Sequence, residues 1–154
     1  MGQITDDVYT LRDEFKLPGM RVMQFAFGDD LPLSPHAPHN YIDNCFAYTG
    51  THDNNTTRGW YETDIDKSGR KLINAYTGQN IKAKNINKAI IRLCYSSVAK
   101  AVIIPIQDVL GLNGQSRMNI PSSANGNWLW RLKQDNTLDK AMKYLNELAV
   151  LYNR

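Results

Sequence analysis

Cysteine is scarce in this chain, with only two among 154 residues. Cys45 and Cys94 each lie inside an apolar stretch, whereas the disulfide framework of a small secreted domain needs several paired cysteines. The sequence therefore predicts two buried free thiols and a reducing compartment, with the cytoplasm as the default location.

Long apolar runs are also missing. The longest uninterrupted run, Ala101 to Ile106, is far shorter than the roughly 20 residues that cross a bilayer. The first residues, Met1 to Asp7, lack both the charged leader and the apolar core of a secretory signal. We therefore expect a soluble protein without a membrane segment or a secretory signal.

An excess of one charge is absent as well, because 18 basic residues are balanced by 15 acidic ones, for a net charge of +3. The sequence contains no basic run and no cluster of arginine with aromatic residues, so it does not favour nucleic-acid binding. With 154 residues and 42% hydrophobic content, residues 1–154 are expected to form a single domain with a real core.

Helical and strand patterns alternate along the chain. Helical spacing of apolar residues predicts helices behind Thr5, near Thr56, over Asn85 to Ala99, and behind Asn136 or Thr137. Continuous apolar runs predict strands at Arg21 to Phe27, up to Tyr48, and at Ala101 to Ile106, while a polar stretch around Gly69 and Gly78 is left unassigned. Buried strands separated by helices indicate an α/β fold with a parallel sheet covered on both faces, and the last helix is expected to cover that sheet.

The most informative segment is Tyr48 to Trp60, where an apolar run gives way to polar side chains. His52 and Asp53 stand side by side where the strand should end. The residues that follow, Asn54 to Thr56, are good helix N-caps. The pair should therefore lie at a strand-to-helix corner, where α/β proteins keep their ligands.

A series of short motifs extends almost from one end of the chain to the other. They are Gly2-Gln3-Ile4-Thr5, Leu11-Arg12-Asp13, Leu17-Pro18-Gly19-Met20, Gln24-Phe25-Ala26-Phe27, Pro38-His39-Asn40-Tyr41, Thr49-Gly50-Thr51-His52-Asp53-Asn54, Gln107-Asp108-Val109-Leu110-Gly111-Leu112, Arg117-Met118-Asn119-Ile120-Pro121 and Gly126-Asn127-Trp128. In this order they resemble the 4-alpha-glucanotransferases, also called amylomaltases or disproportionating enzymes.

The resemblance implies the C-terminal segment of a (β/α)8 TIM barrel, with about three parallel strands and their helices. Active sites of such barrels lie at the carboxyl ends of the strands. In the family, the stretch like Gly2 to Thr5 directly follows the segment that holds the general acid/base glutamate. We therefore expect the nucleophile and the acid/base to lie upstream of Met1. The missing part of the barrel is an expected partner, and an open sheet also permits self-association.

The implied reaction transfers α-1,4-glucan segments to the 4-hydroxyl of glucose or another α-glucan by a retaining double displacement. Two carboxyl groups suffice for this chemistry, so neither a metal nor an organic cofactor is implied. Asp53 matches the family's third carboxylate, which contacts sugar hydroxyls and favours the oxocarbenium-like state. His52 matches a neighbouring substrate donor and Asn119 a further substrate contact. The chain departs from the family's Pro-Gly-Thr at Pro121-Ser122-Ser123, where glycine would permit backbone angles that serine avoids.

Several other side chains allow more than one interpretation. The three tryptophans can stack on sugars, although packing of the corner and the loop is the favoured role for Trp60, Trp128 and Trp130. The guanidinium groups of Arg117 and Arg131 can hold a carboxylate or form structural ion pairs. Asp108 is interpreted as a helix-start residue without chemistry.

Two other functions compete with glucan transfer. His36, His39, His52 and Asp53 offer the ligand types of a zinc site, but Pro38 prevents the helical turn that would align His36 with His39, so a metal site is disfavoured. The other is a catalytically silent α-glucan-binding module that keeps Asp53 and His52 but lacks the transfer carboxylates.

Overall fold

The computed structural model describes residues 5–133 and 137–154. Within these residues the strands are β1 (Gly19–Val22), β2 (Cys45–Tyr48) and β3 (Ala101–Ile103), and the helices are α1 (Asp6–Glu14), α2 (Thr57–Gly59), α3 (Lys67–Thr77), α4 (Ile86–Ser96), α5 (Ile106–Val109) and α6 (Thr137–Tyr152). Single turns lie at η1 (Met23–Phe25), η2 (Pro38–Asn40) and η4 (Gly114–Ser116), and the π-helical η3 (Trp60–Asp64) continues α2. Gly2 to Ile4 of the first motif and the proposed cap Asn136 lie outside the described residues.

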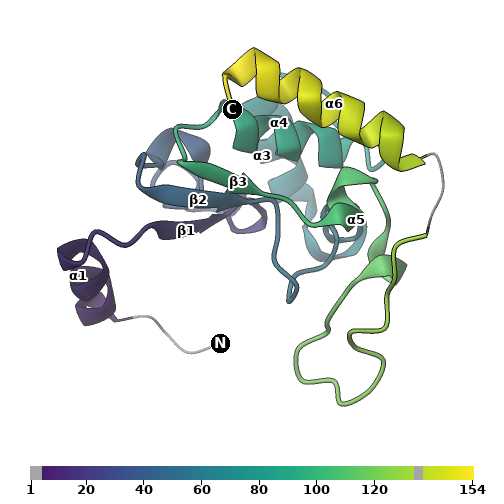
Figure 1. The fold of residues 1–154 in the computed structure, drawn as a ribbon, viewed down its shortest axis with the longest axis horizontal. Helices are drawn as coiled ribbons and strands as arrows, with labels where there is room; N and C mark the ends of the chain where they lie inside the picture. Colours follow the sequence, from purple (N-terminus) through teal and green to yellow (C-terminus); the bar gives the residue numbers. More distant parts are fainter. Residues whose placement is uncertain (1–4, 134–136) are drawn as a thin grey trace.

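The three strands form one parallel sheet in the order β1-β2-β3. In its register, Met20 pairs with Phe46, which in turn pairs with Ala101. The carboxyl ends of all three strands therefore lie at one edge of the sheet (Figure 1). The predicted parallel sheet is confirmed. The loop that carries His52 and Asp53 starts at this edge, because the central strand ends at Tyr48.

Two strands are shorter than the apolar runs predicted. β1 ends at Val22, whose N–H donates to Nδ1 of His36 over 3.0 Å, and the η1 turn follows. β3 ends at Ile103, and Pro105 then stands at the N-cap of α5 without an N–H to offer a sheet. The run Arg21 to Phe27 is mostly buried, but no residue of Ala101 to Ile106 is, so the expectation of a buried strand is wrong for β3. In both places contacts at the strand end turn the backbone before the apolar run is over.

Helices cover one face of the sheet. Cys45 and Ala47 of β2 are fully buried there, in the same core cluster as Ile73 of α3 and Ile90 of α4. On the opposite face, Met20 is 52% exposed and Ile103 44% exposed. The expectation of a sheet covered on both faces is therefore wrong for the described residues. One apolar face of this sheet still faces solvent.

Helix α3 occupies the polar stretch that the sequence left unassigned. Asp66 caps its N-terminus by accepting a hydrogen bond from the Gly69 N–H over 2.8 Å, and Gly78 ends it in the left-handed conformation with φ +65°. Fully buried Ile73, with partly buried Leu72 beside it, attaches the helix to the core. The many polar residues of the outer face hid this narrow apolar stripe.

Helix α6 lies along α4 rather than on the sheet (Figure 1). Leu148 is its buried residue, the Tyr152 hydroxyl accepts from Arg92 over 3.1 Å, and the Tyr144 hydroxyl donates to the Lys88 carbonyl over 3.1 Å. The predicted helix is confirmed, but its predicted position over the sheet is wrong. Because α4 already covers the sheet, α6 packs on the outside of α4.

Helix α1 projects away from the body of helices (Figure 1). None of its residues is buried, and the apolar side chains of Val8, Leu11 and Phe15 are exposed. The predicted helix is confirmed. Its apolar stripe, however, is not covered by any of the described residues.

The two cysteines provide a test of the core. Cys45 and Cys94 are free and fully buried, and burial raises the pKa of each thiol. Because the thiolate is the reactive form, we expect neither thiol of the folded chain to react with a disulfide reagent at mildly alkaline pH. Both should react once urea unfolds the chain, and Cys45→Ser should leave one reactive group. Fast labelling of the native protein would contradict the described core.

Candidate active site

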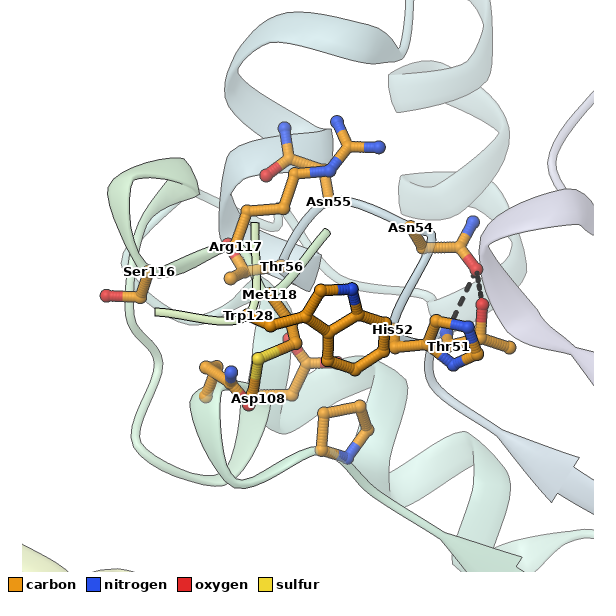
Figure 2. A pocket seen from close by; sticks show the side chains of 12 residues that line it. Thr51, His52, Asn54, Asn55, Thr56, Asp108, Ser116, Arg117, Met118 and Trp128 are labelled. Carbon is orange, nitrogen blue, oxygen red and sulfur yellow. Dashed lines mark hydrogen bonds between the residues drawn. The ribbon is translucent and has the colours of Figure 1, made fainter. Parts of the chain in front are cut away.

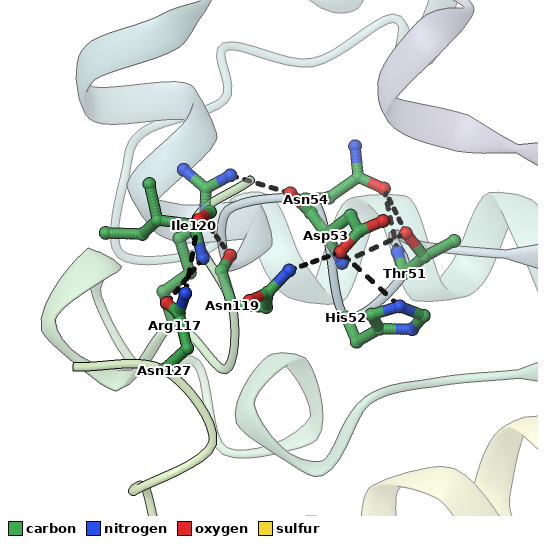
Figure 3. Close-up of polar contacts among 8 residues, drawn as sticks. All are labelled: Thr51, His52, Asp53, Asn54, Arg117, Asn119, Ile120 and Asn127. Atoms are coloured by element: carbon green, nitrogen blue, oxygen red, sulfur yellow. Dashed lines mark hydrogen bonds and ion pairs between the residues drawn. The ribbon is translucent and has the colours of Figure 1, made fainter. Parts of the chain in front are cut away.

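The loop that follows β2 is folded by its own side chains. Oδ1 of Asn54 accepts hydrogen bonds from the N–H and the hydroxyl of Thr51, over 2.9 and 2.8 Å. The Asp53 N–H donates to the Thr51 hydroxyl oxygen over 3.3 Å. These contacts close a tight turn of the kind that Asn and Thr favour. His52 and Asp53 lie within this turn, just beyond the carboxyl end of the central strand (Figure 3).

The three site residues chosen from the sequence meet at one carboxylate. Nε2 of His52 lies 3.4 Å from Oδ1 of Asp53, and the side-chain amide of Asn119 donates to the same oxygen over 2.6 Å. The Asp53 side chain is 39% exposed and that of His52 57% exposed, so both remain open to a ligand. Asn119 lies 66 residues further along the chain, which makes the contact a product of the fold.

Asn119 belongs to a second loop, whose backbone is held by Asn127. The Asn127 side chain accepts from the Ile120 N–H over 2.8 Å and donates to the Ser123 carbonyl over 2.9 Å. Ser122 adopts φ +68°, the left-handed conformation that glycine accepts more readily. Ser122, where the resemblance implies glycine, therefore adopts a glycine-like conformation, and the bonds of Asn127 hold this loop.

A cavity of about 220 Å³ lies next to His52, Arg117 and Trp128 (Figure 2). Its lining comes from the loop after β2, from α5 with the preceding Pro105, and from the second loop: Thr51, His52, Asn54, Asn55, Thr56, Pro105, Gln107, Asp108, Ser116, Arg117, Met118 and Trp128. Asp53 is not part of the lining. The cavity mixes apolar surface with amide and hydroxyl groups. This surface complements a sugar ring, which has apolar C–H faces and a rim of hydroxyls.

The tryptophans separate into two kinds. Trp60 is 8% exposed and packs against Phe27, as expected for a core aromatic. Trp128 is 53% exposed, has φ +63°, and its ring lies 5.2 Å from the ring of His52. Trp128 thus packs against His52 of the corner, but its ring is half exposed and borders the cavity. Trp130 lines a different, smaller depression near Leu110 and Leu132.

A buried carboxylate that the sequence left without a role holds this corner together. Oδ1 of Asp108 accepts from the Thr57 N–H over 2.6 Å, and Oδ2 accepts from the hydroxyls of Thr49 and Thr57 over 2.5 and 2.7 Å. Asp108 is 2% exposed. Burial raises the pKa of Asp108, and the three hydrogen bonds oppose that rise. Through these hydrogen bonds the Asp108 carboxylate connects α5 with the end of β2 and the start of α2.

Asp108 lies in the first turn of α5, so its assignment as a helix-start residue is confirmed. Its hydrogen-bond partners lie 51 and 59 residues away in the chain, and no local pattern announces such contacts. The Asn87 side chain donates to the Asp108 carbonyl over 2.9 Å and adds α4 to the same junction. The one available sign of a buried carboxylate was the position of Asp108 between the apolar residues Ile106 and Val109.

Removing the Asp108 carboxylate should destabilise the chain strongly. Asp108→Ala leaves one N–H and two hydroxyls buried without an acceptor, at a cost of about 3 kcal/mol or more of unfolding free energy. Urea unfolding followed by circular dichroism measures this cost, with the exposed Asp29→Ala as a matched control that should change stability little. A loss of equal, small size in both variants would show that Asp108 does not hold the corner.

The histidines of the alternative metal site are engaged elsewhere. Nδ1 of His36 accepts the Val22 N–H, and burial lowers the pKa of His36, which favours the neutral ring. Nδ1 of His39 lies 2.9 Å from the Tyr76 hydroxyl. Within residues 5–133 and 137–154, no group of three or more His, Cys, Asp or Glu side chains is arranged to hold a metal ion.

The site therefore consists of a carboxylate, an imidazole and an amide at the carboxyl edge of a parallel α/β sheet, the position of active sites in (β/α)8 barrels. The profile of the family described as 4-alpha-glucanotransferase matches residues 1–137. The chain belongs to this family. Within the described residues, no helix has the length and apolar character needed to span a bilayer.

Curated relatives and solved structures agree with this assignment. Over its whole length the chain is 45% identical to the chloroplastic/amyloplastic 4-alpha-glucanotransferase of Solanum tuberosum and 44% identical to the 4-alpha-glucanotransferase of Aquifex aeolicus, covering 27% and 31% of those proteins. An amylomaltase of Streptococcus agalactiae, solved in complex with acarbose, superposes with a TM-score of 0.91 at 32% identity, and the chain covers 31% of it.

A more distant structure, the amylomaltase of Corynebacterium glutamicum, superposes with a TM-score of 0.66 at 12% identity and shares the fold; the chain matches it over 96% of its own length and covers 26% of that protein. The fold is thus confirmed as a segment of the amylomaltase barrel, with three parallel strands and their helices. The chain spans about 30% of the length of the relatives it matches.

Proposed function

We propose that residues 1–154 form the C-terminal part of a 4-alpha-glucanotransferase barrel and contribute substrate contacts to its active site. The complete barrel transfers α-1,4-glucan segments to the 4-hydroxyl of glucose or another α-glucan. The observation that carries the proposal is the meeting of Asp53 with His52 and Asn119 at the carboxyl end of the central strand. A carboxylate flanked by two hydrogen-bonding side chains suits a sugar with several hydroxyls.

In this proposal Asp53 assists the reaction without becoming bonded to the sugar. Its charge stabilises the positive charge that develops at the cleaved glucosyl unit, because a fixed charge aimed at the transition state lowers the barrier. Both protein neighbours contact Oδ1, so sugar hydroxyls are expected at Oδ2. His52 and Asn119 then donate to the same sugar, and the exposed ring of Trp128 borders it.

Two further carboxyl groups, a nucleophile and an acid/base about 5 Å apart, complete the retaining reaction. We infer that an upstream part of the barrel supplies them and covers the open side of this sheet. The exposed face around Met20 and Ile103, and the unpaired edges of β1 and β3 among the described strands, support such a partner, since a barrel closes with eight strands. Neither a metal nor an organic cofactor enters this proposal.

A catalytically silent α-glucan-binding module is the second candidate. Such a module would keep the cluster of Asp53, His52 and Asn119 but lack the nucleophile and the acid/base. The two candidates differ in the outcome of one experiment, the joining of this chain to the missing part of a barrel.

For the cellular location we infer a reducing compartment, the cytoplasm in the first instance, because Cys45 and Cys94 are both free thiols within the core. The relative from Solanum tuberosum is described as a plastid protein, so the compartment follows the source organism rather than the fold.

The test joins residues 1–154 to the upstream part of the Aquifex aeolicus relative in place of its own matching part. The joined protein should convert maltotriose to glucose and longer oligomers, and the 154-residue chain alone should not. Asp53→Asn in the joined protein should lower kcat by about 10²-fold or more, because the amide keeps the shape and loses the charge. Asp30→Asn, an exposed change outside the cluster, serves as the control.

Two outcomes would count against the proposal. Near-normal transfer by a folded Asp53→Asn protein would remove Asp53 from the mechanism. A folded but inactive joined protein whose 154-residue part still binds maltotriose in calorimetry would favour the silent glucan-binding module instead.

A further inference from the structure

Arg117 contacts the main chain of two of the three site residues. Its Nη2 donates to the carbonyl oxygen of Asp53 over 2.6 Å, and its Nε donates to the carbonyl oxygen of Asn119 over 2.7 Å (Figure 3). The guanidinium is partly buried and contributes to the lining of the cavity. The sequence left open whether Arg117 holds a carboxylate or forms a structural ion pair. In the structure it donates to two backbone carbonyls instead.

The two carbonyls belong to the residues whose side chains bond to each other. Asn119 donates to Oδ1 of Asp53 over 2.6 Å, so the three residues form a closed set of hydrogen bonds that links the loop after β2 with the second loop. A carbonyl lies next to the Cα of its own residue. Fixing it therefore restricts the direction in which the side chain of that residue leaves the backbone.

We propose that Arg117 is a positioning residue, which sets the orientation of the Asp53 carboxylate by holding the backbones of Asp53 and Asn119 in one fixed relation. The inference rests on the proposed function for its effect on transfer. The planar guanidinium presents two N–H groups in fixed directions, whereas a lysine ammonium is a compact charge on a flexible stem. Arg117 therefore contributes the fixed geometry of its guanidinium group as well as its positive charge.

Arg131 offers a matched control within the same part of the chain. Its guanidinium also donates to two carbonyls, those of Trp128 and Trp130, both over 2.8 Å, but these are local contacts within three residues. Arg117, in contrast, reaches across 64 residues to Asp53. Changing both arginines in the same way separates the general loss of an arginine from the loss of this particular bridge.

The first measurement uses the protein joined to its upstream part. Arg117→Met and Arg117→Lys should each lower kcat by about 10²-fold, the loss expected for a misplaced catalytic group, with KM changed by about threefold or less. Arg131→Met and Arg131→Lys leave the bridge between Asp53 and Asn119 intact and disturb only the Trp128 loop, so each should retain a kcat at least about tenfold above that of the corresponding Arg117 variant. Added guanidinium ion should restore part of the kcat of Arg117→Ala, while ammonium ion should not.

The second measurement uses the 154-residue chain alone and does not depend on transfer activity. In its NMR spectrum, the Asn119 side-chain amide should have a resolved shift from its bond to Asp53. That shift should collapse towards the exposed value in Arg117→Lys and persist in Arg131→Lys, while circular dichroism shows both variants folded. The amide therefore reports on the bridge even if the joined protein proves inactive and the proposed function fails.

Either of two results would overturn the inference. Full activity and an unchanged Asn119 amide in Arg117→Lys would show that the positive charge suffices. A loss confined to thermal stability, with normal kcat in the folded fraction of both Arg117 variants, would show that the arginine merely strengthens the loop.

Discussion

The burial of the Asp108 carboxylate is the constraint on which the site geometry depends. A carboxylate removed from water is stable only when its oxygens receive hydrogen bonds, and here all three donors come from Thr49 and Thr57. These two residues bracket the loop that carries His52 and Asp53. Because both ends of the loop are fixed to one group, the loop cannot shift along the sheet edge without exposing or unpairing that group.

The rest of the site is arranged on this fixed loop. Asn119 reaches Asp53 from a second loop, and α2 and η4 approach so closely that a Cβ on Gly59 would lie 2.7 Å from Cα of Gly114. That close approach brings the second loop alongside the first. The Asp53 carboxylate is thus held by contacts made among the described residues, whereas the sheet face around Met20 and Ile103 is left uncovered by them.

The sequence was sufficient where the information was local or came from family motifs. Periodicity predicted α1, α4 and α6, apolar runs predicted three parallel strands, and motif order identified the amylomaltase barrel. It failed where long-range contacts decide the outcome. The apolar stripe of α6 gave no sign that α4 would lie beneath it, and the polar outer face of α3 masked its few buried residues.

The same division holds within the site. Asp53, His52 and Asn119 were selected from motifs, and the structure brings them together, although their roles stay predictions. Trp128 was expected to pack the corner and the loop; it contacts His52 of the corner, but its side chain is 53% exposed. Asp108 and Arg117 lie within quoted motifs, but the sequence did not predict their contacts, because each bonds to a partner more than 50 residues away.

The partners of Asp108 also set an order of assembly. Its acceptor oxygens find their donors only after chain segments 51 and 59 residues distant have come together, a loop closure that is slow compared with helix formation. Until then the ionised carboxylate remains in water, and the corner beneath the loop stays hydrated. Pairing of β2 with β3 closes a chain loop of similar length, so the turn holding Asp53 should become ordered no earlier than the sheet itself.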